Sequence, residues 1–155
     1  MKLRRGTSII EIVIATALIS VSIISALSLA NHSQKQNSYS ITSAQASKYT
    51  SQAIDWIRTQ RDTLGWSTIA TKSAADSSDN QATYCLNTLP SSTTNFTDLS
   101  PGTCSVDNYI SDTIFQRQMI IDTSSQASGI LKISVIVTWM ENIARQTRVE
   151  LELTQ

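Results

Sequence analysis

The sequence predicts an α+β fold in which a long N-terminal helix packs on a three-stranded antiparallel sheet, with a disulfide-closed loop region between them. Three observations predict it. Proline and glycine are absent from Thr7 to Leu64, so nothing forces a break in a helix. From Phe115 onward, apolar and polar residues alternate as in half-buried strands. Between Ser67 and Ser105, 16 of 39 residues are serine or threonine. Neither the 3.6-residue period of a helix nor the two-residue period of a strand is visible there.

The first element is an apolar segment from Ile12 to Ala30. It contains 19 consecutive residues without a charge, a glycine or a proline, which is about the length that a helix needs to cross a bilayer. Lys2, Arg4 and Arg5 precede the segment, and few basic residues follow it closely. This asymmetry predicts a single-pass membrane protein, with its N-terminus in the cytoplasm and its head on the other side.

One carboxylate, Glu11, lies at the start of the apolar segment and has three interpretations. A cleaved secretory signal would end in small residues such as Ser28-Leu29-Ala30, but the apolar region of such signals is usually shorter, roughly 7–15 residues. A plain signal anchor fits the length and leaves Glu11 unexplained, because acidic residues inside membrane helices are costly and are usually paired or functional. The third interpretation comes from the residues around Glu11.

The stretch RRGTSIIEIVIA contains a basic leader, Gly6, Thr7 and then Glu11 within an unbroken apolar run. It resembles the N-terminus of type IV pilins and type II secretion pseudopilins. The resemblance implies that a prepilin peptidase cuts between Gly6 and Thr7, which makes residues 1–6 a leader peptide and residues 7–30 a transmembrane and filament-core helix. It also implies that Glu11 of one subunit neutralises the new ammonium of a neighbour. Thr7 departs from the family, whose usual first mature residue is an N-methylated phenylalanine.

The head comprises residues 31–155, and its first part, residues 31–65, continues the helix. Apolar residues recur there at spacings of three, four and seven, and this 3.6-residue period predicts an amphipathic helix whose apolar stripe faces the core of the head. Gly65 is a natural helix end. The residues of the stripe are Tyr49, Ala53, Trp56, Ile57 and Leu64.

The second part of the head, residues 66–114, is expected to be a loop region. It contains the only two cysteines of the chain, Cys85 and Cys104. In an exported chain such a pair predicts a disulfide. The loop that it closes, of about 20 residues, is long and polar, and segments of this kind need a covalent link.

The last part of the head, residues 115–155, is expected to form a meander of three antiparallel strands. FQRQMIID, residues 115–122, reads as the first strand. In the second and third strands, apolar side chains alternate with polar or charged ones, so one face of the sheet can cover the stripe of the helix. The alternating apolar residues are Leu131, Ile133, Val135, Val137 and Trp139, and then Val149, Leu151 and Leu153.

The resemblance extends to the head. The stretches WIRTQRD, FQRQMII, ISVIVTW and ARQTRVELEL are similar to motifs of V-type minor pilins and I-type minor pseudopilins. The implied partners are other pilin or pseudopilin subunits, the prepilin peptidase, an inner-membrane assembly platform and membrane lipid.

Composition narrows the possible functions further. The formal charge is zero, with 12 basic and 12 acidic residues, and no polybasic cluster follows the leader, so nucleic-acid binding is disfavoured. One histidine and four glycines leave no set of residues for a catalytic triad, a zinc site or a phosphate-binding loop. We therefore expect no cofactor and no enzymatic activity.

Two functions remain from the sequence. The first is a structural subunit, a minor pilin or pseudopilin, that is processed after Gly6 and assembled into a filament through its N-terminal helix. The alternative is a single-pass envelope protein that keeps its leader and binds a surface, a sugar or DNA through its head. The mass of the mature chain distinguishes them.

Overall fold

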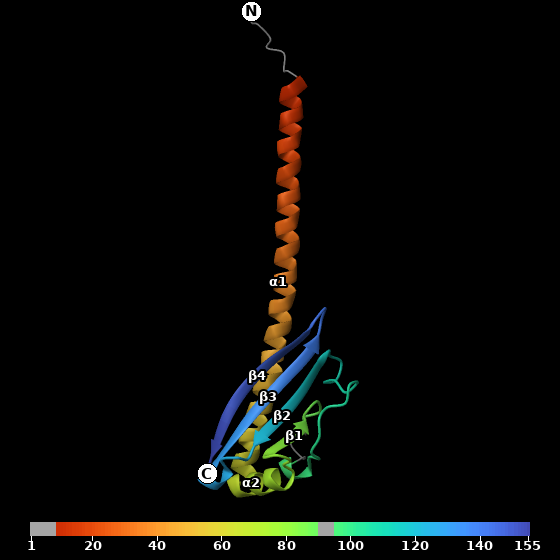
Figure 1. Cartoon of the computed structure of the whole chain (residues 1–155). Coiled ribbons are helices and arrows are strands. Elements are labelled where there is room, and N and C mark those ends of the chain that lie inside the picture. Colours follow the sequence, from red (N-terminus) through yellow and green to blue (C-terminus); the bar gives the residue numbers. More distant parts are fainter. Residues whose placement is uncertain (1–8, 90–94) are drawn as a thin grey trace, which may run out of the picture. The chain divides into compact units, whose positions relative to one another are not determined.

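The computed structural model describes residues 9–89 and 95–155. It confirms the α+β fold, with a long N-terminal helix and an antiparallel sheet (Figure 1), and it contains a disulfide. The chain divides into two units, Met1–Thr42 and Ser43–Gln155. The second unit contains the end of the long helix and all the remaining elements, and it is called the head below.

The long helix, α1, runs from Ile9 to Leu64. It ends where the sequence predicts, because Gly65 adopts a φ of 80°, a left-handed conformation that glycine reaches without strain. The N–H of Gly65 donates to the Arg61 carbonyl at 2.9 Å and so completes the last turn.

A second helix, α2 (Trp66–Ala75), follows Gly65 at once. The expectation of a loop beginning at residue 66 was wrong here. The sequence WSTIATKSAA contains two hydroxyl residues in its first three positions, and they obscure a helical face formed by Ile69, Ala70 and Ser73, which are all buried. Burial of this face against the core stabilises a helix that its composition alone does not specify.

The sheet has four strands in the order β1-β2-β3-β4, and each neighbouring pair is antiparallel (Figure 1). The predicted count of three was wrong because β1 lies in the expected loop region. β1 is only five residues long, too short for its alternation to stand out, and it is held by pairing with β2 from Gln81↔Asp122 to Cys85↔Gln118. The strands are β1 (Gln81–Cys85), β2 (Phe115–Asp122), β3 (Ile130–Met140) and β4 (Ala144–Thr154).

The core of the head lies between one face of the sheet and the stripe on the last part of α1. The alternation of β2 and β3 matches the predicted period of two, and the stripe is confirmed in the region from Ala46 to Gln60. Burial of this apolar surface is the main source of stability. The buried residues of α1 are Ala46, Thr50, Ala53, Ile54, Ile57 and Gln60.

Two hydrophobic clusters make up this core. The larger one joins α1, α2, β1 and η1 (Phe96–Asp98) to the middle of the sheet, and in it the Tyr84 ring meets the Phe96 ring edge-on, with ring centroids 5.2 Å apart. The smaller one packs Ala46 of α1 against the ends of β2 and β3. Its aromatic members, Phe115 and Trp139, have centroids 5.7 Å apart.

The predicted disulfide is present between Cys85, the last residue of β1, and Cys104, with a Cα–Cα distance of 4.8 Å. Near it, the N–H of Gly102 donates to the Thr83 carbonyl at 2.7 Å. The segment before Cys104 is therefore held against β1 by a covalent bond and a backbone hydrogen bond.

Replacement of both Cys85 and Cys104 by serine should lower the free energy of unfolding of the head by about 3 kcal/mol, because the unfolded chain regains the entropy of a loop with a sequence separation of 19 residues. Urea unfolding of the full chain in detergent, followed by the fluorescence of its three tryptophans, measures this. An unchanged midpoint would show that the loop is held without the disulfide.

Candidate functional site

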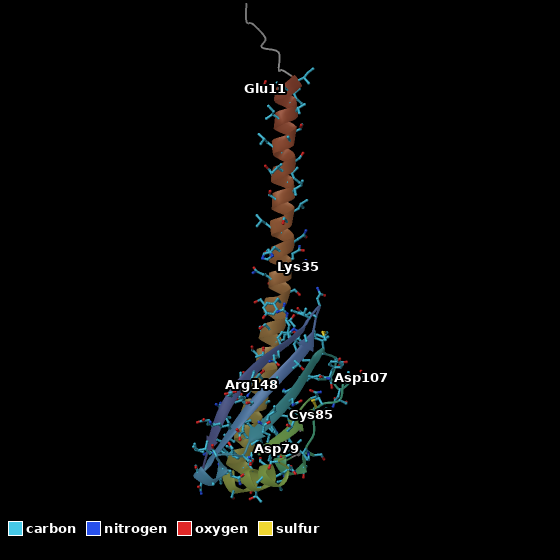
Figure 2. The ribbon with its side chains drawn as sticks, viewed as in Figure 1. Glu11, Lys35, Asp79, Cys85, Asp107 and Arg148 are labelled. Carbon is cyan, nitrogen blue, oxygen red and sulfur yellow. A yellow bond between two sulfur atoms is a disulfide. The ribbon has the colours of Figure 1, made fainter. Side chains whose placement is uncertain are left out.

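The first part of α1 exposes a continuous apolar surface. Each large apolar side chain from Ile9 to Leu29 is at least 54% exposed, and these side chains project outward along the helix (Figure 2). They occupy consecutive positions such as Ile12, Val13 and Ile14, so they surround the helix. By its length and composition, the helix that carries this segment could cross a membrane.

The hydroxyl groups in this segment are compatible with an apolar environment. Ser20, Ser22 and Ser25 donate to the carbonyls of Thr16, Leu18 and Val21 at 2.8 Å each. A serine bonded to the preceding helical turn leaves no donor unpaired when lipid or another helix surrounds it. The segment therefore remains suitable for an apolar environment despite its serines.

Glu11 is the exception on this surface. It is exposed, lies in the first turn of the described helix, and has no ion-pair partner among the described residues. A carboxylate near a helix N-terminus is favoured by the helix dipole, but that contribution is too small to offset transfer into lipid. The other two predicted site residues, Gly6 and Thr7, lie outside the described residues.

Arg117 has a structural role in the head that the sequence analysis did not identify. Its side chain lies in the core, and the residue is 2% exposed. Its Nε and Nη2 donate to the Leu86 carbonyl at 3.0 and 2.8 Å, and its Nη1 donates to the Tyr49 carbonyl of α1 at 3.0 Å. Burial lowers the pKa of Arg117 to about 10, so the guanidinium remains charged at neutral pH.

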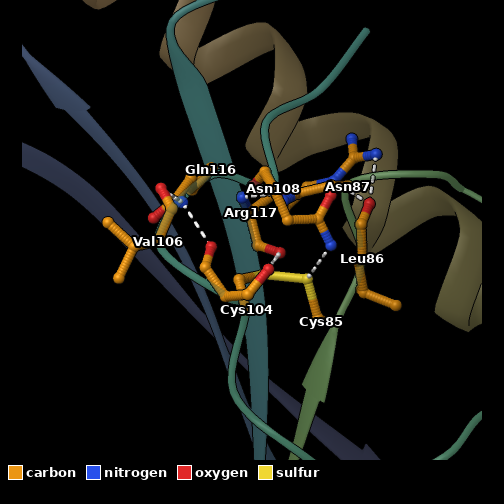
Figure 3. Close-up of a disulfide and its surroundings, with 9 residues drawn as sticks. Cys85, Leu86, Asn87, Cys104, Val106, Asn108, Gln116 and Arg117 are labelled. Atoms are coloured by element: carbon orange, nitrogen blue, oxygen red, sulfur yellow. Dashed lines mark hydrogen bonds between the residues drawn. A yellow bond between two sulfur atoms is a disulfide. The ribbon is translucent and has the colours of Figure 1, made fainter.

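Asn87 completes this polar cluster. Its side-chain oxygen accepts from the backbone N–H of Arg117, and its side-chain amide donates to the Asn108 carbonyl. Gln116 precedes Arg117 in β2, and its side-chain amide donates to the Ser105 and Val106 carbonyls at 2.9 and 3.0 Å. The bonds of Gln116 attach the segment from Cys104 to Asn108 to β2, and the disulfide attaches it to the end of β1 (Figure 3).

A second polar cluster joins α2 to β1. Lys72 and the hydroxyl of Tyr84 each lie 2.8 Å from one oxygen of the Asp76 carboxylate. Burial and the adjacent carboxylate raise the pKa of Tyr84 above its ordinary value. Burial raises the pKa of Asp76, but the bonds from Lys72 and Tyr84 outweigh it and leave that pKa below its ordinary value. The cluster is thus a neutral tyrosine bonded to an ion pair.

The side chains of these two clusters bond to one another and to the main chain of the head. In residues 9–89 and 95–155, no three histidine, cysteine, aspartate or glutamate side chains lie close enough to hold a metal ion. Both cysteines are joined in the disulfide. The candidate functional site of the described chain is therefore the exposed first part of α1 with Glu11.

Comparisons of this chain with known protein families, with curated proteins and with solved structures find no match.

Arg117→Lys should lower the free energy of unfolding by about 2 kcal/mol, because lysine keeps the charge and loses the fork that bridges the Leu86 and Tyr49 carbonyls. Urea unfolding of the full chain in detergent measures the change. Arg58→Lys is the matched control, since that side chain is 55% exposed, and we expect a change within about 0.5 kcal/mol. Equal stability of the two variants would contradict the bridging role.

Proposed function

We propose that this protein is a structural subunit of a type IV pilus or a type II secretion pseudopilus, most similar to a minor pilin, which is processed after Gly6 and assembled through the first part of α1. The observation that carries the proposal is the apolar helix of residues 9–30, exposed on all sides, with a single carboxylate at Glu11. A helix of this kind must be covered by lipid or by other chains.

The head supports this proposal because it has a core of its own. Its apolar stripe on α1, from Ala46 to Ile57, is covered by its own sheet, whereas the surface from Ile9 to Leu29 is left for other molecules. Transfer of that surface from lipid to a bundle of similar helices moves it between two apolar environments. A subunit can therefore be stored in the membrane and later incorporated into a filament at little cost in hydrophobic free energy.

Glu11 favours one axial register between neighbouring helices of the bundle. A carboxylate inside an apolar bundle is tolerated when a cation lies beside it and is strongly destabilising when none does. Cleavage after Gly6 creates a cation, the ammonium of Thr7, four residues before Glu11. Pairing of Glu11 in one subunit with Thr7 in the next sets the axial position of the two helices.

The location and the partners follow from this function. Before assembly, the subunit lies in the inner membrane with its leader in the cytoplasm and its head outside, as the cations before the apolar segment predict. It meets the prepilin peptidase on the cytoplasmic side, and then an assembly platform and other pilin or pseudopilin subunits. After assembly it belongs to the filament.

Expression together with a prepilin peptidase should shorten the chain by residues 1–6, so that Thr7 becomes the N-terminal residue. Intact-mass spectrometry of the purified protein measures this, and a further gain of one methyl group would show N-methylation of Thr7. Gly6→Leu is the control and should keep its full length. A wild-type chain that stays intact would support the unprocessed envelope protein and overturn the filament proposal.

Glu11→Ala should leave cleavage unchanged and reduce incorporation into filaments by about tenfold or more, since the ammonium of the neighbouring Thr7 loses its buried partner. Quantitative immunoblotting of sheared filaments against whole cells measures incorporation. Ile12→Ala, which removes apolar surface and keeps the carboxylate, is the matched control and should have a small effect. Normal incorporation of Glu11→Ala would count against charge pairing.

A further inference from the structure

The two edges of the sheet differ in how they are covered. β1 forms one edge, and its Thr83 carbonyl accepts a bond from Gly102 in the disulfide-linked segment. β4 forms the other edge and is 11 residues long (Figure 1). In the described part of the chain no strand lies beyond β4. A long free edge is a template for pairing with another strand.

The phase of hydrogen bonding shows which residues of β4 face outward. At the two ends of the β3–β4 pair, Gln155 N–H donates to Gly129 at 3.0 Å and Glu141 N–H donates to Ile143 at 3.3 Å. Bonded and non-bonded pairs alternate along antiparallel strands, so the odd-numbered residues of β4 are bonded to β3. The even-numbered residues from Gln146 to Glu152 therefore direct their N–H and C=O groups away from the sheet.

The apolar face of the sheet is incompletely covered at the same edge. Val149 lies at the centre of β4, directly opposite Val135 of β3. Val135 is fully buried, whereas Val149 is 41% exposed. A strand added beside β4 would place a side chain next to Val149 and would extend the core by one position.

The charged side chains of β4 form a self-complementary pattern. Arg148 and Glu150 lie on the outer face of the sheet and form an ion pair with each other at 2.8 Å (Arg148 is labelled in Figure 2). Charges on an edge strand usually oppose pairing. When β4 meets a copy of itself antiparallel and centred on Val149, however, each Arg148 lies opposite a Glu150. Centring on Arg148 or on Glu150 instead places two like charges together, and centring on Thr147 places Arg148 opposite the neutral Gln146. Charge therefore favours the register centred on Val149.

We propose that the β4 edge is a self-association surface, on which a second copy of this chain adds its own β4 antiparallel in the register centred on Val149. The two four-stranded sheets become one continuous sheet. About eight backbone hydrogen bonds form, two for each opposed pair of even-numbered residues from Gln146 to Glu152. The two Val149 side chains cover each other, and Arg148 and Glu150 of both copies alternate in sign.

This contact goes beyond the proposed filament role because of its symmetry. The last part of α1 crosses the sheet from Ala46, next to Trp139, to Ile57, in the cluster that contains Leu131 and Leu153. The two-fold axis that pairs two β4 strands reverses the direction of this part in the second copy. The β4 contact therefore has two-fold symmetry, whereas the proposed filament packs its helices in parallel.

Cysteine crosslinking of the full-length chain in detergent tests this surface. Val149→Cys adds a single free thiol, since Cys85 and Cys104 are bonded to each other. In the proposed register the two thiols face each other across a non-hydrogen-bonded pair, with Cα atoms about 4.5 Å apart, which suits a disulfide. Mild oxidation should give a covalent dimer at least about tenfold faster than in Val106→Cys, the control at a residue that is 82% exposed on another segment.

Two further variants define the register and the charge pattern. Thr147→Cys and Leu151→Cys should crosslink with each other in a mixture and hardly at all alone, because 147 of one copy lies opposite 151 of the other. Arg148→Glu in the Val149→Cys chain should slow dimer formation about tenfold, since it replaces two attractive pairs by two repulsive ones. Adding Glu150→Arg should restore the rate.

Either of two outcomes would overturn the proposal: crosslinking of Val149→Cys no faster than that of Val106→Cys, or a rate that Arg148→Glu leaves unchanged. Tryptophan fluorescence of each variant confirms that the head is folded. The Glu11→Ala change should leave crosslinking at position 149 intact while it impairs filament incorporation. The self-association surface and the proposed function can therefore fail separately.

Discussion

The head depends on one buried interaction, the guanidinium of Arg117 with two backbone carbonyls. A cation in the core is unfavourable unless acceptors surround it, and here Leu86 and Tyr49 supply them. These acceptors belong to the segment after β1 and to α1, while Arg117 itself belongs to β2. These hydrogen bonds therefore hold three parts of the head in one arrangement. The disulfide reinforces it, because Cys85 lies one residue before Leu86.

The helix α1 meets two different requirements along its length. From Ala46 to Gln60 its buried residues follow a stripe, because one side packs on the sheet and the other meets water. From Ile9 to Leu29 the apolar residues occur on every side, a pattern that is stable only when the whole circumference is surrounded by apolar material. The change of pattern along α1 separates the part that folds the head from the part for which we propose a role in assembly.

Much of this fold could be predicted because periodic patterns dominate it. The alternation in β2, β3 and β4 and the glycine at position 65 required no tertiary information. β1 was missed because five residues carry little period, and α2 because its first hydroxyl residues obscure its buried face. The stability of both elements comes from partners elsewhere in the sequence. The role of Arg117 was missed for another reason: the alternation places it inward, but its acceptors are main-chain carbonyls, which have no sequence signature. The partner of Glu11 cannot be read from one chain, since the proposed pair joins two.

The two surfaces proposed for contact have opposite symmetry, and this follows from their chemistry. In the proposed filament the apolar helix packs in parallel with its copies, and the carboxylate of Glu11 is the group that discriminates between registers. The β4 edge is directional, because its hydrogen bonds and its alternating charges are satisfied by a copy that runs the opposite way. A parallel contact can repeat without limit and builds a filament, whereas a two-fold contact closes on itself after two chains. The two proposed contacts use different residues, the helix contact those of the first part of α1 and the two-fold contact those of β4.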